Sequence, residues 1–327
     1  MGEILERRRA ETTERIESLR RELKDAEALC GERACVYVTG SFGRRETSPH
    51  SDLDLFIAGK STLDKPELSR LDEILIKADL IEATRTLHIR DFSGDGEYLK
   101  HYTIKELVDA LGTQEDDVEN TFTARLLLLL ESFPLIGESA YHQVTDEVIA
   151  AYWKDYEGHK SDFMPAFLAN DVLRMWRTFC VNYEARTRRE PDKEMAKRRL
   201  KNYKLKHSRL LTCSSALLYL LAVFSRNKTV SPADAKHMIS LTPTARLEWM
   251  LLQPELGDAH SSLKKLIDGY EQFLSNTEAP ESDLVVRFMD KRQRDEHLKS
   301  AYRFGDLVFD VLDTIGKRSL FHRLLVV

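Results

Sequence analysis

The sequence has few cysteines and no long apolar run, and these two gaps exclude several classes of protein. No cysteine pair has CxxC or metal-ligand spacing, so the four cysteines predict neither a zinc site nor a disulfide framework and are expected to be reduced and buried. The longest leucine run, Leu126–Leu130, is far shorter than the ~20 apolar residues that span a bilayer. The first 23 residues lack the apolar core of a signal peptide and predict a charged helix. We therefore expect a cytoplasmic protein with no membrane partner.

Further absences narrow the choice of function. The chain has no GxxxxGK[ST] motif, which excludes a P-loop, and it shows neither internal repeats nor a low-complexity linker. A net charge of −5 argues against a bulk nucleic-acid binder, so any basic surface must be local. At 327 residues, two domains are expected.

The hydrophobic patterning predicts an α+β protein. Apolar residues at helical spacing predict helices over 3–29 and 65–84, and short β-rich segments predict strands over 34–39 and 52–58. Residues 86–104 suggest a glycine turn between two short extended pieces. From about residue 105 the pattern is helical almost throughout. We predict a small mixed-sheet core with an N-terminal helix at residues 1–110, followed by an all-α helical bundle at residues 111–327.

One stretch, TGSFGRRETSPHSDLDL at residues 39–55, carries the chemistry. A strand that turns through Gly40 and Ser41 can offer backbone N–H groups and a hydroxyl to a phosphate. Asp52 and Asp54 alternate along a predicted strand, so both point to one side of the sheet and can share metal ions. Their hard carboxylate oxygens suit Mg²⁺. A phosphate cradle beside a divalent-metal site is typical of nucleotidyl transfer.

The motif GSFGRRETSPHSDLDL resembles the signature of the DNA polymerase β-like nucleotidyltransferase superfamily, in which Gly-Ser is followed by Asp-x-Asp. The arginine after the second glycine, Arg44, is similar to that of bacterial uridylyltransferases that modify a nitrogen-regulatory protein, and of their uncharacterised relatives. The resemblance implies a bacterial enzyme of the EC 2.7.7 type that binds ATP or another NTP. It also implies two Mg²⁺ ions (or Mn²⁺) on Asp52 and Asp54, and nucleotide contacts from Gly40, Ser41 and Arg44.

The superfamily normally adds a third carboxylate on a later strand, which acts as a general base or completes the second metal site. Asp95 is the first choice here, Glu97 the second and Asp91 the third. The glycines around Asp95 fit a plain turn equally well, because aspartate is also a favoured turn residue. If no acid reaches the site, the resemblance points to a nucleotide-binding protein with weak or lost catalysis.

The helical half has two polar surfaces of interest. Asn170, Arg174, Arg177 and Glu184 form one helical stripe that suits either phosphate or solvent. The densest basic run, residues 186–209, holds eleven Lys or Arg against three acids and could face triphosphate, RNA or solvent. In the superfamily, lysines of the helix after the core contact the triphosphate, a role that Lys204 and Lys206 match best.

These features lead to one main function and two alternatives. The first is Mg²⁺-dependent transfer of NMP from an NTP to a hydroxyl of a protein, an RNA or a small molecule, with release of pyrophosphate and with the helical domain closing the nucleotide cleft. The second is an NTP-binding regulatory module without turnover. The third is a helical-domain RNase, because Arg292 and His297 form the R-x4-H pattern of helical RNases that accompany nucleotidyltransferases.

Overall fold

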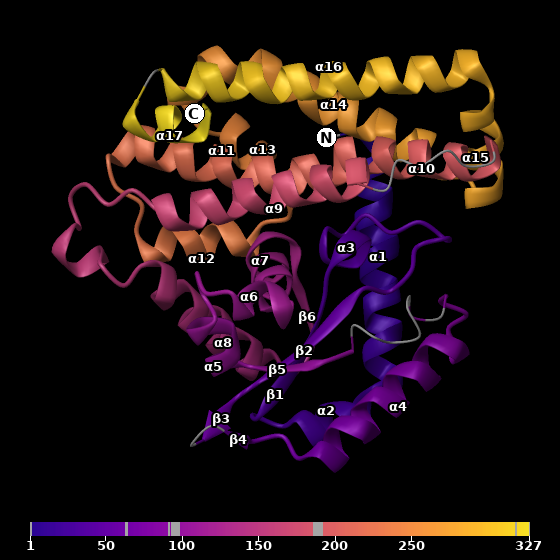
Figure 1. Ribbon diagram of the computed structural model, residues 1–327, viewed down its shortest axis with the longest axis vertical. Coiled ribbons are helices and arrows are strands. Elements are labelled where there is room, and N and C mark those ends of the chain that lie inside the picture. The colour runs from indigo at the N-terminus through magenta and orange to yellow at the C-terminus, as the bar shows by residue number, and fades with distance from the viewer. Residues whose placement is uncertain are drawn as a thin grey trace. The chain divides into compact units, whose positions relative to one another are not determined.

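The chain folds into two compact units, Glu3–Lys154 and Asp155–Val327. The computed structural model, shown in Figure 1, describes residues 2–62, 65–90, 92, 99–185, 192–317 and 319–326. The division between the units falls later than the boundary expected at residue 110, because three further helices and a strand beyond that point pack into the first unit.

The first unit is built on a mixed four-stranded sheet. Its strands are β1 (Ala34–Val38), β2 (Leu55–Gly59), β5 (His101–Thr103) and β6 (Phe133–Ile136), in the order β5-β2-β1-β6. Strand β1 pairs antiparallel with β2 and β6, whereas β2 pairs parallel with β5. A separate two-stranded hairpin joins β3 (Ser61–Thr62) and β4 (Lys65–Pro66). The predicted α+β class with a small mixed sheet is confirmed.

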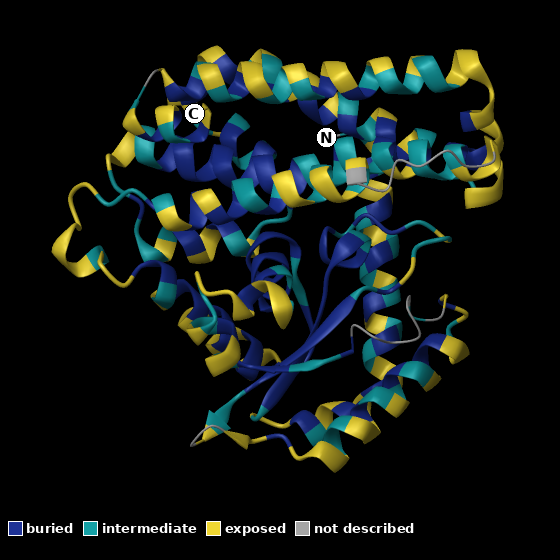
Figure 2. Ribbon diagram, viewed as in Figure 1, coloured by how far each residue is buried: buried dark blue, intermediate teal, exposed yellow. Residues whose placement is uncertain are grey.

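Helices cover both faces of this sheet, and Figure 2 shows its central strands in the buried colour. On one face, side chains such as Val36 and Ile57 join the core formed with α1, α2 and α4. On the other face, Tyr37 stacks on Phe56 and donates its hydroxyl to the Ala124 carbonyl. The helices of the unit are α1 (Glu3–Glu22), α2 (Lys24–Cys30), α3 (Gly40–Gly43), α4 (Arg70–Thr86), α5 (Ile104–Asp109), α6 (Glu115–Val118), α7 (Thr121–Glu131) and α8 (Glu138–Tyr152).

Two segments of the first unit differ from the sequence-based expectation. The predicted helix 65–84 begins only at Arg70, where Ser69 accepts a hydrogen bond from the Asp72 amide. It buries Ile76 and Leu80 and leaves Leu71, Ile74 and Leu75 exposed. Strand β6 was not predicted, because Pro134 interrupts its apolar run. A proline is compatible with an edge strand, and β6 lies at the edge of the sheet.

The second unit is entirely helical in its described residues. Its elements are η2 (Tyr156–Gly158), α9 (Ala166–Ala185), α10 (Asp192–Lys204), η3 (Leu205–Arg209), α11 (Leu210–Asn227), α12 (Pro232–Ser240), α13 (Pro243–Leu251), η4 (Pro254–Ala259), α14 (His260–Asn276), α15 (Glu281–Met289), α16 (Lys291–Gly316) and α17 (Leu320–Val326). The stretch Asp192–Asn227 contains a window long and apolar enough to cross a membrane, but 83% of that window is buried inside the protein. Such burial is typical of the core helix of a bundle.

A π-helical turn, η3, joins α10 to α11 and carries a buried histidine. His207 stacks on Phe273 with ring centroids 4.6 Å apart, and its Nδ1 lies 2.9 Å from the Tyr203 carbonyl oxygen. Its Nε2 has no hydrogen-bond partner among the residues that the structure describes. Burial, together with a smaller effect of the neighbouring His297, lowers the pKa of His207 to about 4. His207 is therefore neutral in the folded protein at neutral pH.

Candidate active site

The Gly40–Ser41 turn of the motif lies where β1 ends. Thr39 donates its backbone N–H to the Asp54 carbonyl over 2.8 Å, which continues the antiparallel pairing of Val38 with Leu55 by one residue. Gly40 then begins α3 with φ of +61°. A Cβ on Gly40 would lie 2.5 Å from Asp54 Oδ2. The positive φ favours glycine here, and the absent side chain lets the turn lie directly against the Asp54 carboxylate.

The two aspartates share one side of an extended segment. Leu53 and Leu55 are each only 3% exposed, whereas Asp52 is exposed and Asp54 is half-buried. This alternation turns the leucines into the core and the carboxylates away from it. Strand β2 begins at Leu55 rather than at Asp52, and Asp52 instead forms an isolated parallel bridge with Arg90.

Helix α1 anchors the loop that delivers Asp52. Thr12 accepts a hydrogen bond from the Thr47 amide over 2.9 Å, and Arg15 donates to the Ser48 carbonyl over 2.7 Å. Next to Asp52, the Ser48 amide donates to Ser51 Oγ over 3.0 Å. These contacts hold the loop between α3 and the aspartates in one conformation.

Ser41 is the first side chain of α3 and is half-buried. Within the part of the chain that the structure describes, its hydroxyl makes no hydrogen bond, so it is available to a ligand. Its carbonyl accepts the Glu46 amide over 2.9 Å, which closes the loop behind it. A free hydroxyl on a tight turn beside two carboxylates is suited to a phosphate group that also binds a metal ion.

Arg44, expected at the nucleotide, has a buried ion-pair environment. Its side chain is 9% exposed, and its guanidinium donates to Glu46 Oε1 over 2.5 Å and to Glu131 Oε2 over 2.8 Å. Glu131 was not singled out from the sequence. Its only signal there is an acid that ends the five-leucine run of α7, and a charge at the end of such a run has to find a buried partner.

All three candidates for the third carboxylate, Asp91, Asp95 and Glu97, lie outside the described residues. No cluster of three or more His, Cys, Asp or Glu side chains suited to a metal ion occurs among the residues that are described. Two carboxylates are nevertheless a usual protein contribution to Mg²⁺, which takes its other ligands from water and substrate phosphates. Asp52 and Asp54 therefore fit a magnesium ion that arrives with a nucleotide.

Lys204 and Lys206 belong to the second unit. Lys204 ends α10, and Lys206 lies on η3 with its Nζ 4.2 Å from the centre of the Tyr302 ring. In the polar stripe on α9, Asn170, Arg174 and Arg177 line a surface cavity of about 310 Å³. The predicted triphosphate contacts of the two lysines stay predictions.

Arg292 and His297 do not form a convergent pair on α16. Arg292 is exposed and pairs with Glu296, whereas the His297 ring stacks on Phe288 with centroids 5.2 Å apart. Residues five apart on an α-helix point about 140° apart. The two residues of the R-x4-H pattern therefore do not face one site: Arg292 lies on the surface, and His297 packs against Phe288.

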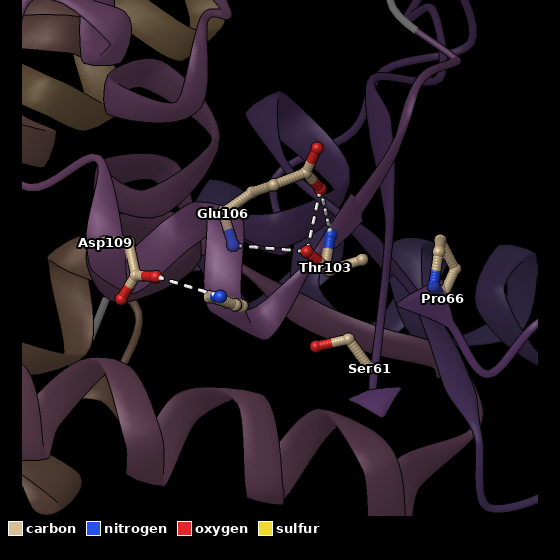
Figure 3. A pocket seen from close by; sticks show the side chains of 6 residues that line it. Ser61, Pro66, Thr103, Glu106 and Asp109 are labelled. Atoms are coloured by element: carbon tan, nitrogen blue, oxygen red, sulfur yellow. Dashed lines mark hydrogen bonds and ion pairs between the residues drawn. The ribbon is translucent and has the colours of Figure 1, made fainter. Parts of the chain in front are cut away.

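A second cavity of about 310 Å³ lies at the other end of β2 (Figure 3). Thr103 and Glu106 form a capping box at its wall, and Lys105 lies 3.8 Å from Asp109. Ser61 and Asp54 are seven residues apart along extended chain, roughly 20 Å. This cavity is therefore separate from the aspartate pair. The hydrogen bonds between Thr103 and Glu106 at its wall cap the N-terminus of α5.

Comparison with known proteins agrees with this geometry. Residues 16–125 match the family model of the nucleotidyltransferase domain. This segment is a nucleotidyltransferase domain of the DNA polymerase β-like superfamily. The domain includes the Gly40 turn, Asp52 and Asp54, and ends before Glu131. No curated protein and no solved structure matches the chain. The narrower resemblance to uridylyltransferases is not confirmed.

Proposed function

We propose that the protein is a Mg²⁺-dependent nucleotidyltransferase that transfers NMP from an NTP to a hydroxyl acceptor. One observation supports this most strongly: within a nucleotidyltransferase domain, the Gly40 turn approaches the Asp54 carboxylate so closely that a single methyl group would not fit. The turn and the carboxylate thus form one site rather than two separate features. Mg²⁺, or Mn²⁺, would be held by Asp52 and Asp54.

Each group at the site has a defined task in this proposal. The Ser41 hydroxyl and the Gly40 turn bind the β- and γ-phosphates, and Lys204 or Lys206 contacts the triphosphate tail. Asp52 and Asp54 hold the metal, which when bound neutralises charge on the phosphates. The acceptor oxygen bonds to the α-phosphorus, the bond to the pyrophosphate oxygen breaks, and the acceptor proton passes to a carboxylate, for which Asp95 is the first candidate.

The test is transfer of label from each of the four α-labelled NTPs in cell extract, followed by separation of labelled protein from labelled RNA. Replacing both carboxylates, Asp52→Asn with Asp54→Asn, should reduce transfer about 100-fold or more. Metal stabilisation contributes several kcal/mol, and each 1.36 kcal/mol is a factor of ten. Undiminished transfer by this double variant would contradict the proposal.

A matched control comes from two other carboxylates of the same unit. Asp25 and Asp79 lie on α2 and α4, and the proximity of Asp25 helps burial to raise the pKa of Asp79. Asp25→Asn with Asp79→Asn removes the same charge and should leave transfer unchanged. If the wild-type protein binds Mg²⁺ and NTP but releases no pyrophosphate with any extract, the regulatory-module alternative replaces the enzyme.

A further inference from the structure

Glu131 joins both ends of the short helix α3 to the end of α7. Its Oε1 accepts the Gly40 N–H over 3.1 Å, and its Oε2 accepts from Arg44 Nη1 over 2.8 Å. Gly40 is the first residue of α3, and Arg44 is its C-cap. The Glu131 side chain is fully buried, so a single carboxylate fixes the whole turn from beneath.

Close backbone atoms block movement of the turn in two directions. A Cβ on Gly43 would lie 1.9 Å from the Glu131 carbonyl oxygen and 2.9 Å from that of Val38. Helix α3 therefore rests on the backbone of both α7 and β1. Sliding it toward either neighbour would bring backbone atoms into collision, so its distance from Asp54 is set by Glu131 and not by the loop alone.

The charges explain why an acid and an arginine are needed together. A carboxylate at the C-terminal end of a helix is disfavoured by the helix dipole, and a buried one also loses its hydration. Arg44 offsets both costs, and Glu46 supplies a second carboxylate to the same guanidinium. The Arg44 guanidinium is thereby directed to Glu131 and Glu46, inside the protein.

We infer that Glu131 and Arg44 are positioning residues for nucleotidyl transfer: the buried pair holds the Gly40–Ser41 turn at the Asp54 carboxylate, and Arg44 acts through Glu131 rather than on the nucleotide. Glu131 lies outside the matched nucleotidyltransferase domain, so this support comes from chain beyond the family segment. The expected effect on kcat rests on the proposed function, whereas the expected effect on the position of the turn does not.

The informative change is Glu131→Gln. Arg44 remains paired with Glu46, so no buried charge is left without a counter-ion and the variant should fold. The amide weakens the hold on Arg44 and lets α3 move relative to Asp54. A misplacement of about 1 Å at a reacting group costs on the order of 100-fold in rate, so kcat should fall at least tenfold while KM for the NTP changes less.

Asp116→Asn is the matched control. Asp116 and Arg125 form another fully buried ion pair of the first unit, 2.6 Å apart, which also bonds to Thr121, Tyr152 and the Leu107 carbonyl. The change removes the negative charge that accepts two hydrogen bonds from the buried Arg125 guanidinium, so it should lower the free energy of unfolding more than Glu131→Gln does. Its kcat should nevertheless stay within about twofold, because the positioning of a reacting group is unaffected. Equal kcat losses in both variants would overturn the inference.

Hydrogen–deuterium exchange separates this inference from the proposed function. In the full-length protein, Glu131→Gln should speed amide exchange over residues 39–46, whereas Asp116→Asn should not. Unchanged exchange over 39–46 overturns the inference, whether or not transfer is found. If the wild-type protein transfers no label but the exchange differs as expected, the proposed function fails and the positioning of the turn stands.

Discussion

Replacing Gly40 by alanine adds one methyl group at the point where the turn and Asp54 meet. The new Cβ would lie 2.5 Å from Asp54 Oδ2 and 3.4 Å from its carboxyl carbon. The backbone at Gly40 also has φ of +61°, a conformation that residues with a Cβ adopt at a cost. The change thus combines a backbone strain with a collision against one carboxylate.

The two effects have different sizes and different targets. The left-handed conformation costs an alanine about 1–2 kcal/mol, which lowers the free energy of unfolding. To restore an ordinary contact of 3.4 Å, the Asp54 oxygen must move by about 0.9 Å. If Asp54 holds the metal as proposed, a displacement of that size should reduce kcat on the order of 100-fold, far more than the loss of stability would suggest.

Gly31→Ala is the control that separates these effects. Gly31 also has a positive φ, +52°, but its Cβ would have no neighbour closer than the Ala28 carbonyl oxygen at 3.9 Å. The assay is chemical denaturation of both variants together with label transfer from α-labelled NTP. Gly40→Ala should lose transfer and Gly31→Ala should keep it at a comparable loss of stability. If both variants retain wild-type kcat, the Gly40–Asp54 contact is not part of the site.

Three further predictions follow from other parts of the molecule. The pKa of His207 in the folded protein, about 4, lies below the ordinary 6.5, so between these pH values the unfolded chain binds a proton that the folded protein does not. The free energy of unfolding should therefore fall by about 3 kcal/mol as the pH falls through this range. Urea denaturation at pH 7 and pH 4.5 should show a smaller loss in His207→Phe. If Lys204 and Lys206 bind triphosphate, Lys204→Gln with Lys206→Gln should raise KM for the NTP severalfold. If the basic run binds RNA, the affinity for a single-stranded RNA should fall steeply with added salt, and an affinity that does not change with salt would exclude RNA binding there. Gly43→Ala should destabilise the first unit by about 3 kcal/mol or more, as measured by thermal unfolding, because its Cβ would meet backbone that cannot move.

The sequence predicted best where local pattern and burial agree. The β-rich run at Ala34–Val38 forms the central strand, and the alternation around Leu53 leaves its two flanking aspartates out of the core. It predicted least where tertiary packing decides between two faces. In α4, either of two apolar stripes suits a helix, and packing against α1 and α2 buries the one with Ile76 and Leu80, leaving Leu71 74% exposed.

The candidate site divides in the same way. The closeness of Gly40 and Asp54 follows from the antiparallel pairing of two strands that are consecutive in the chain, and consecutive strands usually lie side by side. The environment of Arg44 depends on Glu131, 87 residues further along the chain, and no local pattern pairs residues at that separation. A charged residue inside a motif therefore has to be assigned by its partners in the fold.

The motif at residues 39–55 consequently contains two kinds of polar side chain. Ser41 and Asp52 face outward and are suited to meet a ligand, whereas Arg44 and Glu46 turn inward and shape the loop. Arg44 and Glu46 therefore tolerate fewer substitutions than a requirement for their charges alone would allow. Two carboxylates bind different nitrogens of the Arg44 guanidinium, and a lysine ammonium offers no such fork, so Arg44→Lys should weaken transfer even though the charge is kept. The spacing of the motif thus encodes the shape of the loop as well as its chemistry.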